Sequence, residues 1–197
     1  MLFNDISNYF ENINGVIHVG ACFLEENSFY KNELKIKNVL WFEANNEIYE
    51  KVKILHPTED IYNYVVHDVD DAEVVLNVAN NFQSSSILNM KDHRKYYPNI
   101  DYTKKINCKT ISLDTFFKKN NVDKKYNFLN IDVQGAEMFV LNGAKNLLKS
   151  SIDAVYIEVN FKEIYENNAF KHDIDLFLGL YDFELCKLVD SGYGWGD

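Results

Sequence analysis

Residues 126–144 read YNFLNIDVQGAEMFVLNGA, and this stretch decides the fold. Its mostly apolar run at 127–131 has the length of a strand that is covered on both faces in a parallel sheet. Asp132 follows directly, and then come Gly135, Glu137 and a segment with the apolar spacing of a helix. In folds that alternate strands and helices, ligands bind beyond the carboxyl ends of the strands. Asp132 and Glu137 are therefore candidate functional residues, with a helix N-cap as the structural alternative.

Two turns closer to the N-terminus have the same form. GVIHVGAC (15–22) is a short apolar strand that runs into Gly20 and Ala21, two small residues that let a ligand approach the backbone. A second strand, 38–42, ends in Glu43 about twenty residues later, where an acidic side chain can accept hydrogen bonds from ribose hydroxyls. Together the three turns predict a nucleotide-type ligand at the tips of three parallel strands.

The whole chain alternates strand and helix patterns. The predicted strands span 16–19, 39–43, 61–67, 128–132, 154–159 and 183–189, and the predicted helices span 26–34, 47–55, 136–148 and 172–180. Segments 72–79 and 105–113 are strand-like, so we expect a hairpin-like insertion around 72–113, followed by a short helix capped by Asp114. Right-handed crossovers place helices on both faces of the sheet. We therefore predict one α/β domain over 1–197, a doubly wound Rossmann-like three-layer sandwich with a mostly parallel central sheet.

A family resemblance adds to this pattern. The segments VIHVGACFLEE, WFEAN, TISLDTFF, FLNIDVQGAEMFVLNGA and YIEVNFKEIYEN, in this order, resemble the FkbM family of S-adenosylmethionine-dependent methyltransferases. The resemblance runs from about Gly15 to Asp197, and the IDVQGAE turn and the LDTFF segment are its most specific parts. It implies the class I methyltransferase fold, S-adenosyl-L-methionine as cofactor, and methyl transfer to a hydroxyl oxygen of a sugar or another small molecule.

The C-terminal region departs from that resemblance. Methyltransferases of this class usually close their sheet with an antiparallel hairpin, whereas this sequence stops at GYGWGD. We therefore expect the last strand to be absent. Strand 183–189 would then lack a partner, and its exposed backbone amides would let two copies pair as a homodimer.

The resemblance also implies which residues face the cofactor, although two motif positions differ. The family commonly has Asp where this chain has His18, and Gly where it has Leu24. A neutral imidazole can accept a hydrogen bond, and Glu26 would supply the missing charge; a buried structural histidine is the alternative. Leu24 tolerates a positive φ poorly, so we expect a different path into the helix. The expected cofactor-binding residues are His18, Gly20, Ala21, Cys22, Glu26, Glu43 for the ribose, Asp68 and Val69 for the adenine, and Asp132.

Methyl transfer to oxygen requires an acceptor hydroxyl that is held in line and loses its proton. The base must stand near the carboxyl ends of the middle strands, and Asp132 and Glu158 are the predicted catalytic pair. The same grouping could instead hold a divalent cation through oxygen ligands, although we predict no metal site. The expected substrate-binding residues are Glu137, Asn160, which would orient the hydroxyl, and Tyr165, which would stack on a ring.

Composition limits the remaining possibilities. A chain of 197 residues with 47% hydrophobic content suits one compact domain. The net charge of −10 argues against a nucleic-acid partner, because phosphate binding relies on clustered Lys and Arg. Residues 1–10 contain Asp5 and no uninterrupted apolar core, so we expect neither a signal peptide nor a membrane span, and a cytoplasmic location. Three well-separated cysteines fit reduced thiols.

Two classes of function remain. The leading prediction is an O-methyltransferase that uses S-adenosylmethionine and acts on a small-molecule hydroxyl acceptor such as a carbohydrate. The alternative is a noncatalytic methyltransferase-fold module for binding or assembly, which His18, Leu24 and the short C-terminal region favour. A nicotinamide-dependent oxidoreductase is disfavoured because the complete G-x-G-x-x-G fingerprint is missing.

Overall fold

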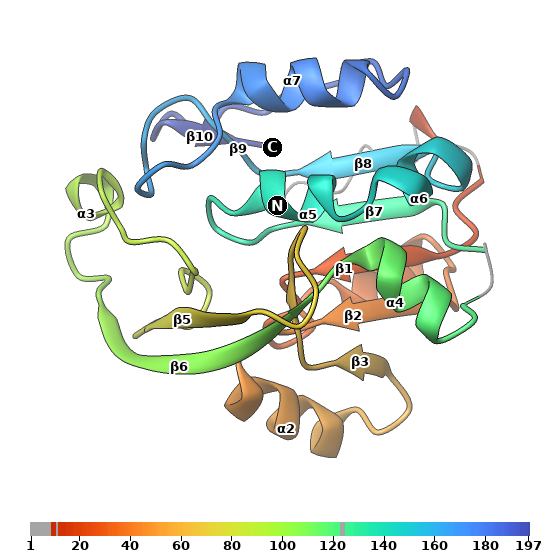
Figure 1. Ribbon diagram of the computed structural model, residues 1–197, viewed down its shortest axis with the longest axis horizontal. Helices are drawn as coiled ribbons and strands as arrows, with labels where there is room; N and C mark the ends of the chain where they lie inside the picture. Colours follow the sequence, from red (N-terminus) through yellow and green to blue (C-terminus); the bar gives the residue numbers. More distant parts are fainter. Residues whose placement is uncertain (1–8, 11, 123–124) are drawn as a thin grey trace.

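A five-stranded parallel sheet forms the centre of the computed structural model, which describes residues 9–10, 12–122 and 125–197 (Figure 1). In spatial order the strands are β3 (Asp60–Tyr62), β2 (Val39–Phe42), β1 (Val16–Val19), β7 (Phe128–Ile131) and β8 (Ala154–Ile157). Val19 pairs with Phe42 on one side and with Ile131 on the other. The carboxyl ends of β1, β2 and β7 therefore lie level at one edge, as the sequence predicts.

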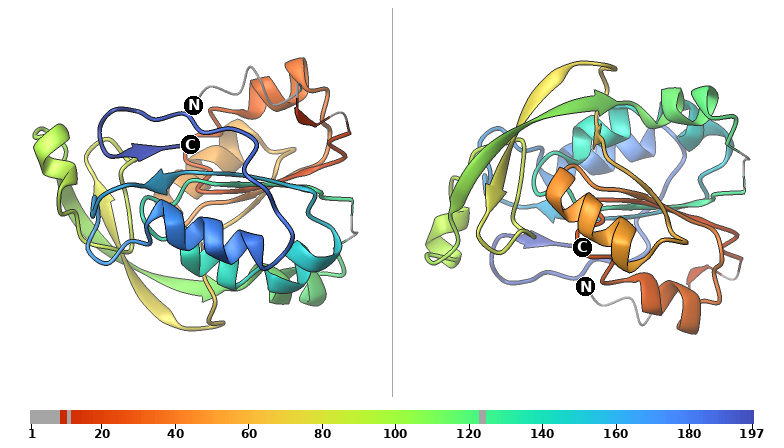
Figure 2. Two further views of the ribbon diagram at one scale, coloured as in Figure 1. Left: turned by 90° about the horizontal axis from the view of Figure 1, so that it is seen from above. Right: turned by 90° about the horizontal axis from the view of Figure 1, so that it is seen from below.

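Helices cover both faces of this sheet (Figure 2). On one face, Ile17 and Val19 of β1 pack in a core with α4 (Leu113–Lys119), α5 (Glu137–Asn142), α6 (Lys145–Ser150) and α7 (Lys171–Gly179). On the other face, Val16 packs with the π-helical turn η2 (Phe29–Glu33) and with α2 (Asn46–Leu55). Because side chains alternate along a strand, both faces of β1 are apolar. The predicted doubly wound three-layer α/β fold is confirmed.

The hairpin insertion is present, with different bounds. Strand β5 (Glu73–Ala79) pairs antiparallel with β6 (Tyr102–Ile111), and α3 (His93–Tyr96) lies in the connection between them. The predicted strand 61–67 is divided, since β3 joins the central sheet whereas β4 (Val65–Val66) pairs with β6. Asn63 lies at the division, where its Nδ2 donates to the Glu43 and Ala44 carbonyl oxygens at 2.8 and 3.1 Å.

The predicted helix 136–148 is also divided, into α5 and α6. A Cβ atom at Gly143 would lie 2.3 Å from the His67 carbonyl oxygen, so the chain needs glycine where the two helices meet. Asp114 accepts hydrogen bonds from the Asn146 and Leu147 amides and thereby caps α6. The expectation that Asp114 caps its own helix is wrong, because Ser112 holds the N-cap of α4.

The predicted strand 183–189 is wrong. Asp182 adopts a φ of +65°, and the Phe183 amide donates to the Leu178 carbonyl, so the chain turns back at the end of α7. Phe183 packs against the core instead of extending a strand. The short strands β9 (Val159–Asn160) and β10 (Trp195–Gly196) pair with each other. The proposed homodimer edge therefore does not exist at 183–189, and the dimer itself stays a prediction.

The helices of the described residues are all too short or too polar to cross a lipid bilayer.

Candidate functional site

The turn after β1 presses the backbone of the glycine loop against both neighbouring strands. The Gly20 and Ala21 amides donate to the Phe42 carbonyl oxygen at 3.0 Å. Gly20 adopts a φ of +94°, and a Cβ atom there would lie 1.8 Å from the Asp132 carbonyl oxygen. Glycine alone combines a left-handed backbone with so close an approach. The loop therefore lies directly beside the tip of β7.

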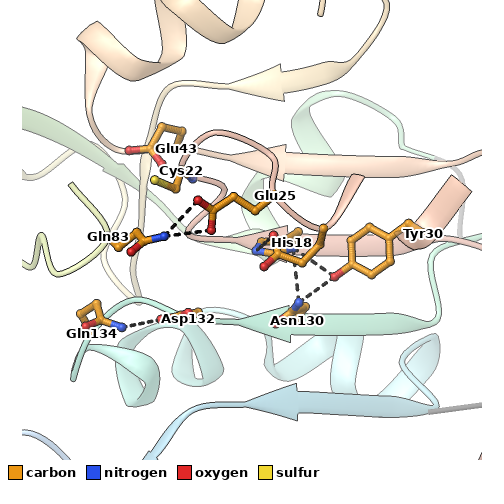
Figure 3. Close-up of polar contacts among 10 residues, drawn as sticks. His18, Cys22, Glu25, Tyr30, Glu43, Gln83, Asn130, Asp132 and Gln134 are labelled. Carbon is orange, nitrogen blue, oxygen red and sulfur yellow. Dashed lines mark hydrogen bonds and ion pairs between the residues drawn. The ribbon is translucent and has the colours of Figure 1, made fainter. Parts of the chain in front are cut away.

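Glu43 joins the tips of β1 and β2 (Figure 3). Its Oε2 accepts a hydrogen bond from the Cys22 amide at 2.7 Å, and its Oε1 accepts one from the Asn45 amide at 2.6 Å. Burial raises the pKa of this carboxyl group to about 7, although both bonds favour the charged form. Each carboxylate oxygen keeps a further lone pair, so Glu43 can still accept bonds from ligand hydroxyls.

Cys22 and Leu24 complete the glycine loop. Burial, followed by the negative charge of Glu43, raises the pKa of the Cys22 thiol to about 12, so Cys22 stays protonated and is no nucleophile. Leu24 adopts a φ of +58° and is buried. The expectation that Leu24 avoids a positive φ is therefore wrong, because burial of its side chain holds it in that conformation.

His18 lies beneath the loop and does not line the cavity described below. Its ring lies 4.8 Å from that of Trp41, and its Nδ1 lies 3.1 Å from the Tyr30 hydroxyl. Burial lowers its pKa to about 3, so the imidazole is neutral. Glu26 Oε2 is 3.9 Å from Nε2, and burial raises the pKa of Glu26 to about 7. This placement favours a buried structural role for His18 over contact with a cofactor. The same holds for Glu26.

Three acidic residues gather at the ends of β7 and β8. Asp132 is partly exposed and lines the cavity described below. Glu158 is buried and is linked to Asp132 by two hydrogen bonds, both donated by the side-chain amide of Gln134. Glu137 is buried, and its Oε1 accepts bonds from the Gly135 and Val133 amides at 2.9 and 3.3 Å, which closes the turn. Glu137 therefore stabilises the loop and does not face a substrate here.

Burial changes the charge state of these acids. It raises the pKa of Glu137 to about 7 and also raises that of Asp132. The pKa of Glu158 lies well above its ordinary value through burial and then the charges of Asp132 and Glu137. Clustered acids with raised pKa values are typical of acid–base sites. No group of three or more His, Cys, Asp or Glu side chains in the described ranges could hold a metal ion.

The two remaining substrate candidates differ in their placement. Asn160 is buried, and neither atom of its side-chain amide has a hydrogen-bond partner among the described residues. It stands two residues after Glu158 along the same strand direction. Tyr165 is 1% exposed, and its hydroxyl donates to Gln134 Oε1 at 2.7 Å. Its ring is therefore unavailable for stacking on a substrate in this conformation.

The adenine candidates lie away from the other residues. Asp68 pairs with His67, and the carbonyl oxygen of Val69 accepts a hydrogen bond from Thr110 Oγ1 at 2.6 Å. Neither Asp68 nor Val69 lines a cavity with Gly20 or Glu43. The division of the strand after β3 carries them to the hairpin side, which residue spacing does not reveal.

A small cavity collects the tips of β1, β2 and β7. It measures about 80 Å³ and is lined by Gly20, Cys22, Glu43 and Asp132, with Phe82 and Ser86 covering it from the insertion. A larger cavity of about 510 Å³ shares Ala44 and Tyr64 with it and reaches Asn107 and Cys108 of β6. The two cavities thus meet at Ala44 and Tyr64, and we call the pair of them the crevice.

The covering segment and the turn after β7 contain residues that sequence reasoning missed. Gln83 Nε2 lies 3.0 Å from both carboxylate oxygens of Glu25 (Figure 3). Ser86 Oγ donates to the Gln134 carbonyl at 2.7 Å. The serine run at 84–86 offers a weak signal for this contact, whereas nothing in the sequence singles out Gln83. Gln134 lies inside the IDVQGAE motif, but its side chain is an uncharged amide that does not titrate, so the sequence does not mark it as a candidate.

A cavity larger than either cavity of the crevice lies elsewhere. It measures about 680 Å³ and is lined mainly by apolar side chains between α7 and β8, among them Ile157, Ile174 and Phe183. Neither Gly20, Glu43 nor Asp132 reaches it. Its size does not make it the candidate site, because the acidic and glycine turns converge on the smaller crevice.

The fold and this crevice define a methyltransferase-type protein: a doubly wound sheet with a glycine loop, an acidic second strand and a carboxylate cluster at the strand tips. Comparison with protein-family models matches residues 18–185 to the methyltransferase FkbM domain. The match covers most of the chain, and the protein therefore belongs to the FkbM methyltransferase domain family. No curated protein and no solved structure gave a significant match.

Proposed function

We propose that the protein is an S-adenosylmethionine-dependent O-methyltransferase that acts on a hydroxyl group of a small molecule, with carbohydrates as the acceptor class. The observation that carries this proposal is the position of Asp132. Asp132 lines the same cavity as Gly20 and Glu43, and its carboxyl group is linked through the Gln134 amide to a second acid, Glu158. A ligand that reaches Glu43 therefore ends beside a pair of potential bases.

The crevice residues suit the chemical groups of the cofactor. Glu43 has lone pairs left for ribose hydroxyls, and Gly20 presents backbone instead of a side chain. The larger cavity beyond Ala44 would hold the adenine in place of the Asp68 and Val69 position. When bound, S-adenosylmethionine would supply an electrophilic methyl group on a positively charged sulfur.

The chain's own part in the reaction is to position the acceptor and remove its proton. A carboxylate with a raised pKa is a better base near neutral pH than one of ordinary pKa. Asp132, which is partly exposed, would take the proton from the acceptor hydroxyl onto a carboxylate oxygen. Glu158 accepts a bond from the same Gln134 amide and is the second candidate base.

Asn160 is the proposed acceptor contact. Buried amide groups nearly always have hydrogen-bond partners, so a buried amide with neither atom satisfied needs an explanation. Asn160 is 1% exposed and lines neither cavity, so an acceptor would reach it only after the residues that cover it move. A hydroxyl group there both donates and accepts hydrogen bonds and would satisfy both atoms of the amide. Carbohydrates carry many such hydroxyls, which supports them as the acceptor class.

Calorimetry with S-adenosylhomocysteine tests the cofactor part. We expect micromolar binding by the wild type and at least a tenfold loss in Glu43→Ala, because the loop loses its tie and the ribose its acceptor. Glu50→Ala, an exposed acid on α2, is the matched control and should bind normally. Absence of binding at millimolar ligand would refute the cofactor assignment.

Mass spectrometry of reaction mixtures tests the acceptor part. The protein is incubated with S-adenosylmethionine and a panel of monosaccharides and nucleotide sugars, and products that gain one methyl group are sought. Asp132→Asn should abolish such products while it retains S-adenosylhomocysteine binding. A product that forms equally with Asp132→Asn would contradict the role of Asp132 as base.

The noncatalytic module remains the second candidate, because one observation favours it. The cavity beside Gly20 measures only about 80 Å³, whereas small-molecule sites usually measure about 300 to 1,000 Å³. If the protein is an enzyme, the segment around Phe82 must move away from Glu43 to make room for the cofactor. The calorimetry above separates the two candidates, since a closed module would not bind.

A further inference from the structure

Gln134 links the two carboxyl groups that the proposed function uses. Its Nε2 donates to Asp132 Oδ1 at 2.6 Å and lies 3.3 Å from Glu158 Oε2, and its Oε1 accepts from the Tyr165 hydroxyl at 2.7 Å. Figure 3 shows the bond to Asp132 at the end of β7. One side chain therefore sets the separation of two acids that follow different strands.

The backbone of Gln134 is held in place for this contact. Its φ of +57° is left-handed, a conformation that residues other than glycine rarely adopt. Its carbonyl accepts the bond from Ser86, and a Cβ atom at Gly135 would lie 2.9 Å from the Tyr165 ring. Tyr165 thus packs directly on the turn. Such conformations persist only where the surroundings fix them, and they gather at functional sites.

The partners of the amide also set its direction. Burial, followed by the charge of Glu158, raises the pKa of the Tyr165 phenol, so its hydroxyl stays protonated and donates to Oε1. The reverse orientation would aim the amide oxygen at two carboxyl groups that accept bonds when ionised. The N–H groups of Gln134 therefore point at Asp132 and Glu158 and favour their ionised forms.

Most other groups around Asp132 and Glu158 favour the protonated forms of these two acids. Burial and like charge raise the pKa of both acids. The titratable groups that face them are Glu25, Glu26, Glu137, Tyr156, Tyr165 and Asp197. Two acids in one buried site tend to retain a proton between them. Donors on Gln134 oppose that tendency at the place where a base is needed.

We propose that Gln134 is a positioning residue for methyl transfer, anchored by Tyr165: it holds the Asp132 and Glu158 carboxyl groups at a fixed separation and keeps an ionised carboxylate ready for the acceptor proton. This inference rests on the proposed function. It gives Tyr165 a role behind the two acids, in place of stacking on the acceptor.

The test follows the carboxyl carbon-13 NMR signals of Asp132 and Glu158 in the full chain as pH is varied, with assignments from Asp132→Asn and Glu158→Gln. Gln134→Met keeps the side-chain length but removes the donors, so the apparent midpoint of the pair should rise by about one pH unit, a tenfold change in proton affinity. Tyr165→Phe should raise it less. Asn89→Leu removes an exposed amide bonded to Glu166, an acid outside the group that faces the pair, and is the control that should change nothing.

The proposal would be overturned if Gln134→Met is as stable in urea as the wild type and its carboxyl titration midpoints lie within about 0.3 pH unit of the wild-type values. If that variant does not fold, Tyr165→Phe decides, and unchanged midpoints there have the same meaning. Calorimetry separates the two levels of inference. Wild type that fails to bind S-adenosylhomocysteine refutes the proposed function, whereas normal binding with unshifted Gln134→Met midpoints refutes only the role of Gln134.

Discussion

Gly20→Ala is expected to destabilise the fold strongly, because the glycine loop leaves no room for a side chain. The added Cβ atom would lie 1.8 Å from the carbonyl oxygen of Asp132 and 2.9 Å from its carbonyl carbon. Both atoms belong to the backbone of the turn after β7, so no side chain can rotate away. The contact is relieved only if β1 and β7 separate or the loop is rebuilt.

The size of the effect follows from the contacts at the loop. A left-handed conformation costs an alanine about 1–2 kcal/mol. Separation of the strand tips would also strain the bond from the Asp132 amide to the Val19 carbonyl and those from Gly20 and Ala21 to Phe42. Each such bond contributes about 0.5–1.5 kcal/mol. The expected loss is therefore about 3–5 kcal/mol, a large part of the stability of an ordinary domain.

Urea unfolding followed by circular dichroism measures this loss as a lower midpoint at an unchanged slope. Gly179→Ala is the matched control, because nothing lies within 4 Å of a Cβ atom at the end of α7. It should leave stability unchanged or raise it by up to about 1 kcal/mol. A loss below about 1 kcal/mol in Gly20→Ala would show that the loop relaxes freely, which the close approach to Asp132 does not allow.

Three further outcomes follow from the same site. The pKa of Glu43 is raised from an ordinary 4.5 to about 7, so ionisation of this group opposes folding. The free energy of unfolding should therefore be highest below pH 4.5 and fall by about 3 kcal/mol as pH rises through 7. In Glu43→Gln, urea midpoints across pH 4.5–8 should lack that decline. Gly135→Ala should lose about 2 kcal/mol in urea unfolding, less than Gly20→Ala, because its Cβ atom meets the Tyr165 side chain and not backbone; a larger loss would contradict this ranking. S-adenosylhomocysteine should slow amide hydrogen exchange in 82–87 but not in 46–55, and equal protection of both would argue against the insertion as the cover of the crevice.

Much of the fold is predictable from the sequence, because its strands are short apolar runs that end in glycine or acid. β1, β2 and β7 are marked in this way, and their parallel order follows from the helices between them. The failed strand 183–189 has similar alternation. No strand forms there because Asp182 makes a left-handed turn and Phe183 packs against the core. The alternation of apolar and polar residues cannot reveal that tertiary contact.

The site divides in the same way. Gly20 and Glu43 are predictable because their spacing reflects backbone geometry at two adjacent strand tips. The burial of His18 and Tyr165 is not predictable, because packing decides whether each side chain faces the crevice. Gln134 is hidden for a different reason: its importance lies in three side-chain hydrogen bonds, to Asp132, Glu158 and Tyr165, and the last two partners lie 24 and 31 positions away in sequence.

The acidity of the crevice connects stability with the proposed chemistry. Glu43 and Asp132 both line the smaller cavity, whereas no lysine or arginine does so in the described part of the chain. Acids buried without a cation oppose folding at neutral pH, as the raised pKa of Glu43 indicates. Under the proposed function, a positively charged sulfur beside these groups would favour their ionised forms, and methyl transfer would then leave a neutral sulfur. The same carboxyl groups would therefore attract the cofactor before the reaction and hold its product less strongly afterwards.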